Sequence, residues 1–224
     1  MKVWAIALAA LAAGGVAWAE ATRNEKFGVE IAFPEKWLVG SGEEPLLMMS
    51  RSSDPVSLAN CVATGEQVPD TRPLTQAQLN EGLSAPFGEE FWRRIYASAG
   101  LKAEVKSQSA RLHKSGVTIQ EAYFDLSKEG AAPASKMSVQ QAIFVRPGYT
   151  VTLACSARAG VYALHKKALS DVIDSVRFFA PSPPVASGDA VAVPVASAKF
   201  TAEGAAKASL SAVRAGQALI DLDK

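Results

Sequence analysis

The sequence is poor in the residues that build metal centres. Its 224 residues include only 2 cysteines and 2 histidines, so a multi-ligand zinc or iron–sulfur site is not expected. The formal net charge is only +1, whereas a general nucleic-acid binder needs a strongly basic surface to displace counterions from the phosphates. We therefore expect neither a cofactor nor a nucleic-acid partner.

The signatures of several enzyme classes are also missing. The chain contains no glycine-rich phosphate loop, no Gly-x-Ser-x-Gly elbow, no His-Glu-x-x-His motif and no EF-hand pattern. The acidic pairs Glu43/Glu44 and Glu89/Glu90 are adjacent in sequence, so their side chains diverge and make poor acid–base dyads. The sequence thus assigns no catalytic, cofactor-binding or metal-binding residue.

Two histidines remain as candidates for proton transfer. His165 falls on the apolar stripe of a predicted helix, where it is either a buried base or, more commonly, a ring packed at the edge of the stripe. His113 stands beside a predicted hairpin turn, and we expect it to be solvated. Asp171 and Asp174 share one face of the same predicted helix and are also expected to be solvated.

The one long apolar run lies at the amino terminus. Lys2 precedes an Ala- and Leu-rich stretch, and Ala17-Trp18-Ala19 fits the small-x-small pattern of signal peptidase. Residues 1–19 are therefore predicted to be a signal peptide cleaved between Ala19 and Glu20. The alternative is a retained membrane anchor, but the run is shorter than the roughly 20 residues that a spanning helix needs. We expect a periplasmic or secreted mature chain with no transmembrane helix.

Cys61 and Cys155 both remain after such processing. An even number of cysteines in an exported chain favours a disulfide, which would close a loop of 94 residues (155 minus 61). Such a loop corresponds to about 4 to 5 kcal/mol in the chain-entropy model. The alternatives are two separate buried thiols and, less favoured because no C-x-x-C motif is present, a redox site. A bridge requires the two strand-like segments that carry the cysteines to lie close together.

Residues 20–180 show the alternation of strands and helices of a single α+β domain. The strands are predicted at 27–33, 46–50, 58–64, 102–113, 117–126, 136–145 and 149–157. The last four read as two hairpins of a continuous antiparallel meander. Pro34 ends the first strand, and Trp37 follows at a turn.

Three helices are predicted in the same region. The first opens with a capping box, Thr75-x-x-Gln78, and the second starts near Pro86 with an aromatic face that we expect to dock on a sheet. The third is amphipathic and should cover the sheet with an apolar stripe made of Val161, Leu164, Ala168, Leu169, Val172, Ile173 and Val176.

The composition changes after Phe179. Residues 181–196 are rich in Pro, Ala and Ser, which is typical of an extended linker. Residues 197–224 form an Ala-rich tail with few large apolar residues, which we expect to be disordered or weakly helical. A docking peptide for a partner is the alternative interpretation of this tail.

The order of elements resembles a known family. Four segments are similar to segments of PsbP-like and DcrB-like domains, a family that includes a Ran-binding nuclear import factor. They are Phe27–Phe33 followed by Pro34-x-x-Trp37, Asn60-Cys61-Val62, Pro147–Ser156 and Ile173–Phe178. The resemblance covers about residues 26 to 179. It implies an α/β/α sandwich, with a central, mostly antiparallel sheet and helices on both faces.

The resemblance also bears on function. Members of this family are mostly non-enzymatic and include extrinsic photosystem II subunits, envelope lipoproteins and chaperones of secreted effectors. The present sequence lacks the lipid-anchor cysteine of the lipoproteins. The expected function is an exported accessory module that binds a protein partner in the cell envelope. The alternatives are a small periplasmic hydrolase or ligand-binding protein that uses His113 or His165, and a structural envelope protein tethered through its tail.

Overall fold

The computed structural model describes residues 21–128, 130, 132 and 135–180. The predicted signal peptide with its cleavage site (Ala19 and Glu20), the linker 181–196 and the tail 197–224 lie outside these residues. No helix in the described part of the chain is both long and apolar enough to cross a bilayer.

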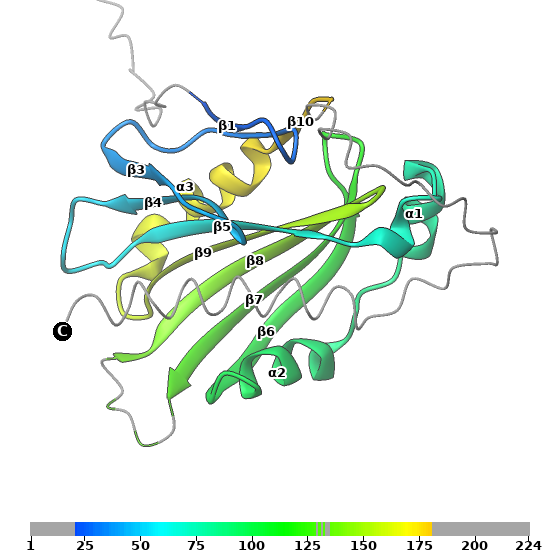
Figure 1. Ribbon diagram of the computed structural model, residues 1–224. Coiled ribbons are helices and arrows are strands. Elements are labelled where there is room, and N and C mark those ends of the chain that lie inside the picture. The colour runs from blue at the N-terminus through cyan, green and yellow to red at the C-terminus, as the bar shows by residue number, and fades with distance from the viewer. Residues whose placement is uncertain (1–20, 129, 131, 133–134, 181–224) are drawn as a thin grey trace, which may run out of the picture.

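Two antiparallel sheets form the described domain (Figure 1). The small sheet contains β1 (Thr22–Asn24), β2 (Val29–Ile31) and β10 (Arg177–Phe178). The large sheet contains β3 (Trp37–Ser41), β4 (Leu46–Ser52), β5 (Asn60–Gln67), β6 (Leu101–Leu112), β7 (Thr118–Lys128), β8 (Met137–Arg146) and β9 (Tyr149–Arg158). Its strand order is β3-β4-β5-β9-β8-β7-β6, so the predicted meander β6–β9 is present and joins the β3–β5 unit through the β5–β9 pair.

Helices cover both faces of the large sheet, as expected for an α/β/α sandwich (Figure 1). Helix α3 (Tyr162–Ser175) packs on one face together with the small sheet. Helices α1 (Gln76–Gly82) and α2 (Glu89–Ala97) pack on the other, α1 against β8 and α2 against β6. A short 3-10 helix, Pro69–Thr71, precedes α1.

The core beneath α3 gathers the alternate residues of β2 and β9. Phe27, Val29, Ile31 and Phe33 are all fully buried, which confirms the predicted apolar face of the first strand, although only three residues of the segment form a strand. From β9 this core takes Tyr149, Val151, Leu153 and Cys155. The period of two places one set of side chains of each strand in this core.

The core beneath α2 is aromatic. Phe91, Trp92, Ile95 and Tyr96 of α2 pack on Phe124 of β7 and its neighbours, so the predicted docking of the aromatic face on the sheet is confirmed. The helix begins at Glu89 rather than near Pro86. The reason is Gly88, whose φ of 85° is incompatible with a helical turn.

Local helix signals were accurate at α1 and less so at α3. Thr75 and Gln78 form the predicted capping box, each accepting a hydrogen bond from the backbone N–H of the other. In α3, Leu169, Val172 and Ile173 are buried as predicted, but Leu164 is 81% exposed. Tyr162 is buried in its place. Because residues advance about 100° each around a helix, Leu164 lies about 200° from Tyr162 and faces solvent.

Candidate functional site

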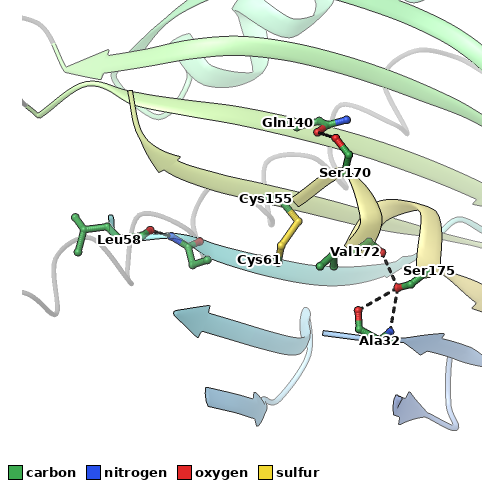
Figure 2. The surroundings of a disulfide bond; sticks show 9 residues. Ala32, Leu58, Cys61, Gln140, Cys155, Ser170, Val172 and Ser175 are labelled. Carbon is green, nitrogen blue, oxygen red and sulfur yellow. Dashed lines mark hydrogen bonds between the residues drawn. A yellow bond between two sulfur atoms is a disulfide. The ribbon is translucent and has the colours of Figure 1, made fainter. Parts of the chain in front are cut away.

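A disulfide joins Cys61 of β5 to Cys155 of β9 at the centre of the large sheet (Figure 2). The two residues are directly opposite each other, and their Cα atoms are 4.0 Å apart. The N–H of Ser52 donates to the carbonyl of Ala59, and the N–H of Val68 donates to the carbonyl of Gly148. Backbone N–H and C=O groups alternate in direction along a strand, so those of Cys61 bond to β4 and not to β9. The two cysteines are therefore a non-hydrogen-bonded pair of β5 and β9, the kind of pair in which side chains come closest.

The disulfide lies in the core beneath α3 and has no exposed surface. Val172 of α3 is drawn beside it in Figure 2. Ser175 closes this helix onto the chain after β2, because its hydroxyl accepts from the N–H of Ala32 at 3.0 Å. A thiol redox site needs solvent access, so this environment favours a structural bridge.

The prediction for His113 was wrong. Its residue exposure is only 2%, and its ring packs edge-on against Phe144 with centroids 5.4 Å apart. The sequence places His113 next to a turn, but its ring lies against Phe144, a residue of the core beneath α3. His165, by contrast, is half-buried on α3.

The surroundings of His113 disfavour its protonated form. Its Nδ1 accepts from the backbone N–H of Ser115 at 3.1 Å and lies 2.8 Å from the Ser115 hydroxyl. Burial lowers the pKa of His113, and the nearby positive charge of Arg111 lowers it further. The Nε2 atom lies 3.9 Å from Oδ1 of Asp174, too far for a hydrogen bond.

Arg111 is the centre of a charged network that the sequence did not suggest. Its guanidinium donates to both oxygens of Glu121 at 2.7 and 3.2 Å and to Oδ1 of Asp174 at 2.7 Å. These hydrogen bonds raise the pKa of Arg111. Asp174 is therefore paired, and not simply solvated as expected. The network ties α3 to β6 and β7.

Ser115, His113 and Asp174 superficially resemble a nucleophile–base–acid set, but their geometry differs from one. His113 already accepts from the backbone at the nitrogen nearest Ser115. Asp174 is neutralised by Arg111, and the His113 side chain has no exposed surface. A shallow groove of about 560 Å³ borders Lys114, Asp174 and Arg177. The set is better suited to fixing the β6–β7 turn than to general-base catalysis.

The β6 edge of the large sheet carries charged side chains. Lys106 and Lys136 both contact Glu104 and Asp125, and hydrogen bonds from the two lysines lower the pKa of Glu104 to about 2. The register also shifts between Val105 and Ser107, which marks a bulge. Charges and bulges are the usual means by which proteins stop an edge strand from pairing with another chain.

The β3 edge has neither protection. The strand Trp37-Leu-Val-Gly-Ser41 contains no charged residue, and Leu38 and Val39 are 58% and 40% exposed. The backbone N–H and C=O groups of Met49 and Arg51 in β4 point toward β3. Their partners, Gly40 and Leu38, therefore make the β3–β4 hydrogen bonds. The N–H and C=O groups of Val39 and Ser41 therefore point outward.

The sequence interpretation missed this strand. It placed Trp37 at a turn, which is correct in that the Trp37 N–H donates to the carbonyl of Pro34. The uncharged apolar pair Leu38-Val39 that follows was the available signal. A strand of only five residues shows too little alternation to be distinguished from a loop.

A groove of about 500 Å³ lies next to the β3 edge, on the same face of the sheet as α1 and α2. The walls combine apolar side chains with polar side chains and with charged side chains of both signs. Its lining includes Leu38, Met49, Leu58, Ala59, Met137, Arg51 and Arg158. The groove and the β3 edge together form the candidate binding site.

Known proteins resemble this chain in fold but hardly in sequence. No family model and no curated protein matches the sequence. The solution structure of cyanobacterial PsbP (CyanoP) from Synechocystis sp. PCC 6803 superposes with a TM-score of 0.52 at 14% identity, over 77% of this chain and 99% of CyanoP. LpqN of Mycobacterium tuberculosis, described as involved in cell envelope biogenesis, gives a TM-score of 0.42 at 15% identity, over 66% and 82%. The architecture and the match to CyanoP show that this chain has the PsbP-like fold.

Proposed function

We propose that the mature chain is an exported accessory module of a bacterial cell envelope, which binds another protein and catalyses no reaction. The observation that carries the proposal is the open edge of β3. Val39 and Ser41 direct unpaired backbone groups outward from this edge. An extended partner segment adds a strand there and gains main-chain hydrogen bonds.

Export is supported by two independent features. The amino-terminal sequence has the order of a signal peptide, a charged residue followed by an apolar run and Ala17-Trp18-Ala19. The buried bridge between Cys61 and Cys155 suits an oxidising compartment such as the periplasm. Fold similarity to CyanoP is compatible with an accessory role but does not define it, because one fold serves many functions.

The chemistry of β3 limits what the partner segment can be. Leu38 and Val39 point to opposite faces of the sheet, and both are exposed. A matching segment carries apolar side chains on both of its faces beside this pair. A highly charged or proline-rich segment fits poorly, because the first leaves the apolar pair uncovered and the second lacks N–H donors.

The proposal is tested by blocking the outward backbone group of β3. Val39→Pro removes one outward N–H and leaves the hydrogen bonds to β4 in place. The matched control is Leu112→Pro on the β6 edge. The His113 N–H donates to Val117 across the hairpin, so the Leu112 N–H points outward too, and its side chain is likewise exposed.

Tagged mature proteins are purified from envelopes after mild crosslinking, and recovered proteins are quantified by mass spectrometry. We expect the wild type and Leu112→Pro to recover the same partner, and Val39→Pro to recover at least tenfold less. Equal recovery by both variants would reject the β3 edge. Recovery of the wild-type module alone under all conditions would reject the binding function.

The hydrolase alternative rests on the 2.8 Å contact between Ser115 and His113. If this pair were catalytic, Ser115→Ala would abolish hydrolysis of a panel of chromogenic esters by the wild-type protein. We expect no hydrolysis above the buffer rate by the wild type, because the ring of His113 is fully covered.

A further inference from the structure

We propose that β3, the terminal strand of the large sheet (Figure 1), also pairs with β3 of a second copy of this chain. The two strands run antiparallel about a two-fold axis at Val39. This inference rests on the function proposed above, because the partner segment and the second copy use the same outward backbone groups. The dimer therefore competes with the partner, which binds only after the two copies separate.

The backbone of β3 fits this symmetric pairing. Val39 directs both its N–H and its C=O outward, so two antiparallel copies centred there exchange both hydrogen bonds between their Val39 residues. The same register sets Ser41 opposite Trp37 of the second copy. The Trp37 N–H is already bonded to the carbonyl of Pro34, but the Trp37 C=O points outward and accepts from the Ser41 N–H.

The register centred on Val39 is the one that pairs the whole of β3 with itself. Outward groups recur at every second residue, so the two-fold axis of an antiparallel pair must pass through a residue position. An axis at Leu38 or at Gly40 sets one end of each strand opposite residues outside Trp37–Ser41. An axis at Val39 sets all five residues of one strand opposite the five of the other.

The side chains are complementary in this register. On the face that carries the groove, Leu38 lies opposite Gly40 of the second copy. A Cβ atom at Gly40 would lie 3.7 Å from Cγ of Met49, so a leucine that covers the bare backbone of Gly40 comes within reach of Met49. Leu38 is exposed in the single chain, and covering its side chain is worth about 25 cal/mol for each Å² of apolar surface removed from water. On the other face, Val39 lies opposite its own equivalent, and β-branched residues pack well in cross-strand pairs.

Charge does not oppose the pairing. The strand contains no charged residue, so no like charges face each other across the axis within β3. The charged residues that flank it lie in the turns at its two ends, outside the paired region, and are Glu35, Lys36, Glu43 and Glu44. The β6 edge differs, because its bulge and the ion pairs of Glu104 and Lys106 interrupt such a pairing.

The short length of β3 limits the strength of the dimer. Stable protein interfaces typically use about 20 to 30 residues on each side, more than a strand of five residues and its neighbours contribute. We therefore expect a weak, reversible dimer. Weak self-pairing suits this edge, because it covers the backbone groups and still releases them to a partner.

The register is tested with purified mature protein and introduced cysteines. Leu38→Cys, Gly40→Cys and an equimolar mixture of the two are oxidised with copper–phenanthroline and analysed by non-reducing electrophoresis. Positions 38 and 40 of the two copies form a non-hydrogen-bonded pair with Cα atoms about 4.5 Å apart, which suits a disulfide. Each position is about 7 to 8 Å from its own equivalent, which does not. The native bridge is fully buried and stays intact.

We expect the mixture to give at least tenfold more disulfide-linked dimer than either variant alone. The matched control is a mixture of Leu112→Cys and Ala110→Cys, which have the same spacing on the β6 edge, and it should give no more than the single variants. A yield from the mixture no higher than the control would overturn the proposal. So would equal crosslinking of Leu38→Cys alone or of Gly40→Cys alone, since either result places the axis elsewhere.

Analytical ultracentrifugation without introduced cysteines gives a second measurement. We expect the wild type and Leu112→Pro to dimerise equally and Val39→Pro to dimerise at least tenfold more weakly, and a monomeric wild type at all concentrations would overturn the proposal. Both measurements use purified protein alone. Partner recovery from envelopes without a dimer would therefore reject only this inference, and a dimer without partner recovery would reject only the function proposed above.

Discussion

The two halves of the large sheet are completed in different ways. The β6–β9 half has helices on both faces, and its edge strand of 12 residues carries an ion-pair network and a bulge. The β3–β5 half ends in a strand of five uncharged residues beside a groove of mixed apolar and polar lining. Protecting an edge strand requires few substitutions, since one or two lysines suffice. The comparison therefore separates an edge protected by charge and a bulge from a short edge that has neither.

The disulfide lies at the junction of these halves. It joins β5 to β9, the strand pair through which the β3–β5 unit is attached to the meander. The bridge thus holds the open half to the covered half. The predictions below change one half or the junction in turn.

Removing the disulfide at the junction of the two halves has the largest expected effect on stability. Cys61→Ala with Cys155→Ala opens a loop of 94 residues, which is worth about 4 to 5 kcal/mol of unfolding free energy in the chain-entropy model. The measurement is urea unfolding of the oxidised wild type and the double variant. A loss below about 1 kcal/mol, at the low end of the range for disulfides, would mean that the bridge adds little to the attachment of the two halves.

Truncating one side chain in each half of the large sheet tests whether the β6–β9 half buries its side chains more completely than the β3–β5 half. Phe124 is fully buried between Trp92 and Tyr96, so Phe124→Ala should cost about 3 to 5 kcal/mol. Met49 lines the groove, so Met49→Ala should cost less than about 1 kcal/mol. Denaturant unfolding of both variants checks this, and similar losses would contradict the comparison.

The buried histidine gives the β6–β9 half a pH dependence. The pKa of His113 is lowered below its ordinary value of 6.5 in the folded state, so between these two values the unfolded chain binds more protons. Stability is therefore complete above pH 6.5 and falls as the pH drops toward the folded-state pKa, by about 1.4 kcal/mol for each unit of pKa difference. His113→Gln should flatten this dependence in unfolding measurements from pH 7.5 to 5. An unchanged slope would show that other groups cause it.

The smallest expected effect is at the open edge itself. Val39→Pro should change the unfolding free energy by less than about 1 kcal/mol, because the lost N–H is outward. Leu38→Pro removes a hydrogen bond to β4 and should cost about 3 kcal/mol. Thermal unfolding of the two variants would contradict the assigned strand orientation if the costs were equal or reversed.

Much of the framework follows from local sequence patterns. The capping box at Thr75, the meander and the buried stripe around Val172 all depend on short-range periodicity, and the structure contains them. The resemblance to PsbP-like domains supplied the sandwich architecture. Local patterns fail where tertiary contacts decide. His113 is buried by Phe144, and Arg111 meets Asp174 across 63 residues of sequence.

The candidate site was the least predictable part for the same reason. An edge strand is defined by the absence of a neighbour on one side, and that property depends on topology rather than on composition. Five residues also carry too little alternation to mark Trp37–Ser41 as a strand. Only the register with β4 shows which of its backbone groups face outward.

The central claim is that the β3 edge receives a partner and the β6 edge does not. It is tested most directly by replacing Val39, and separately Leu112, with a photo-crosslinking residue in living cells and comparing the adducts. We predict a discrete protein adduct from position 39 that is absent from position 112. No adduct from position 39, or the same adduct from both edges, would contradict this account.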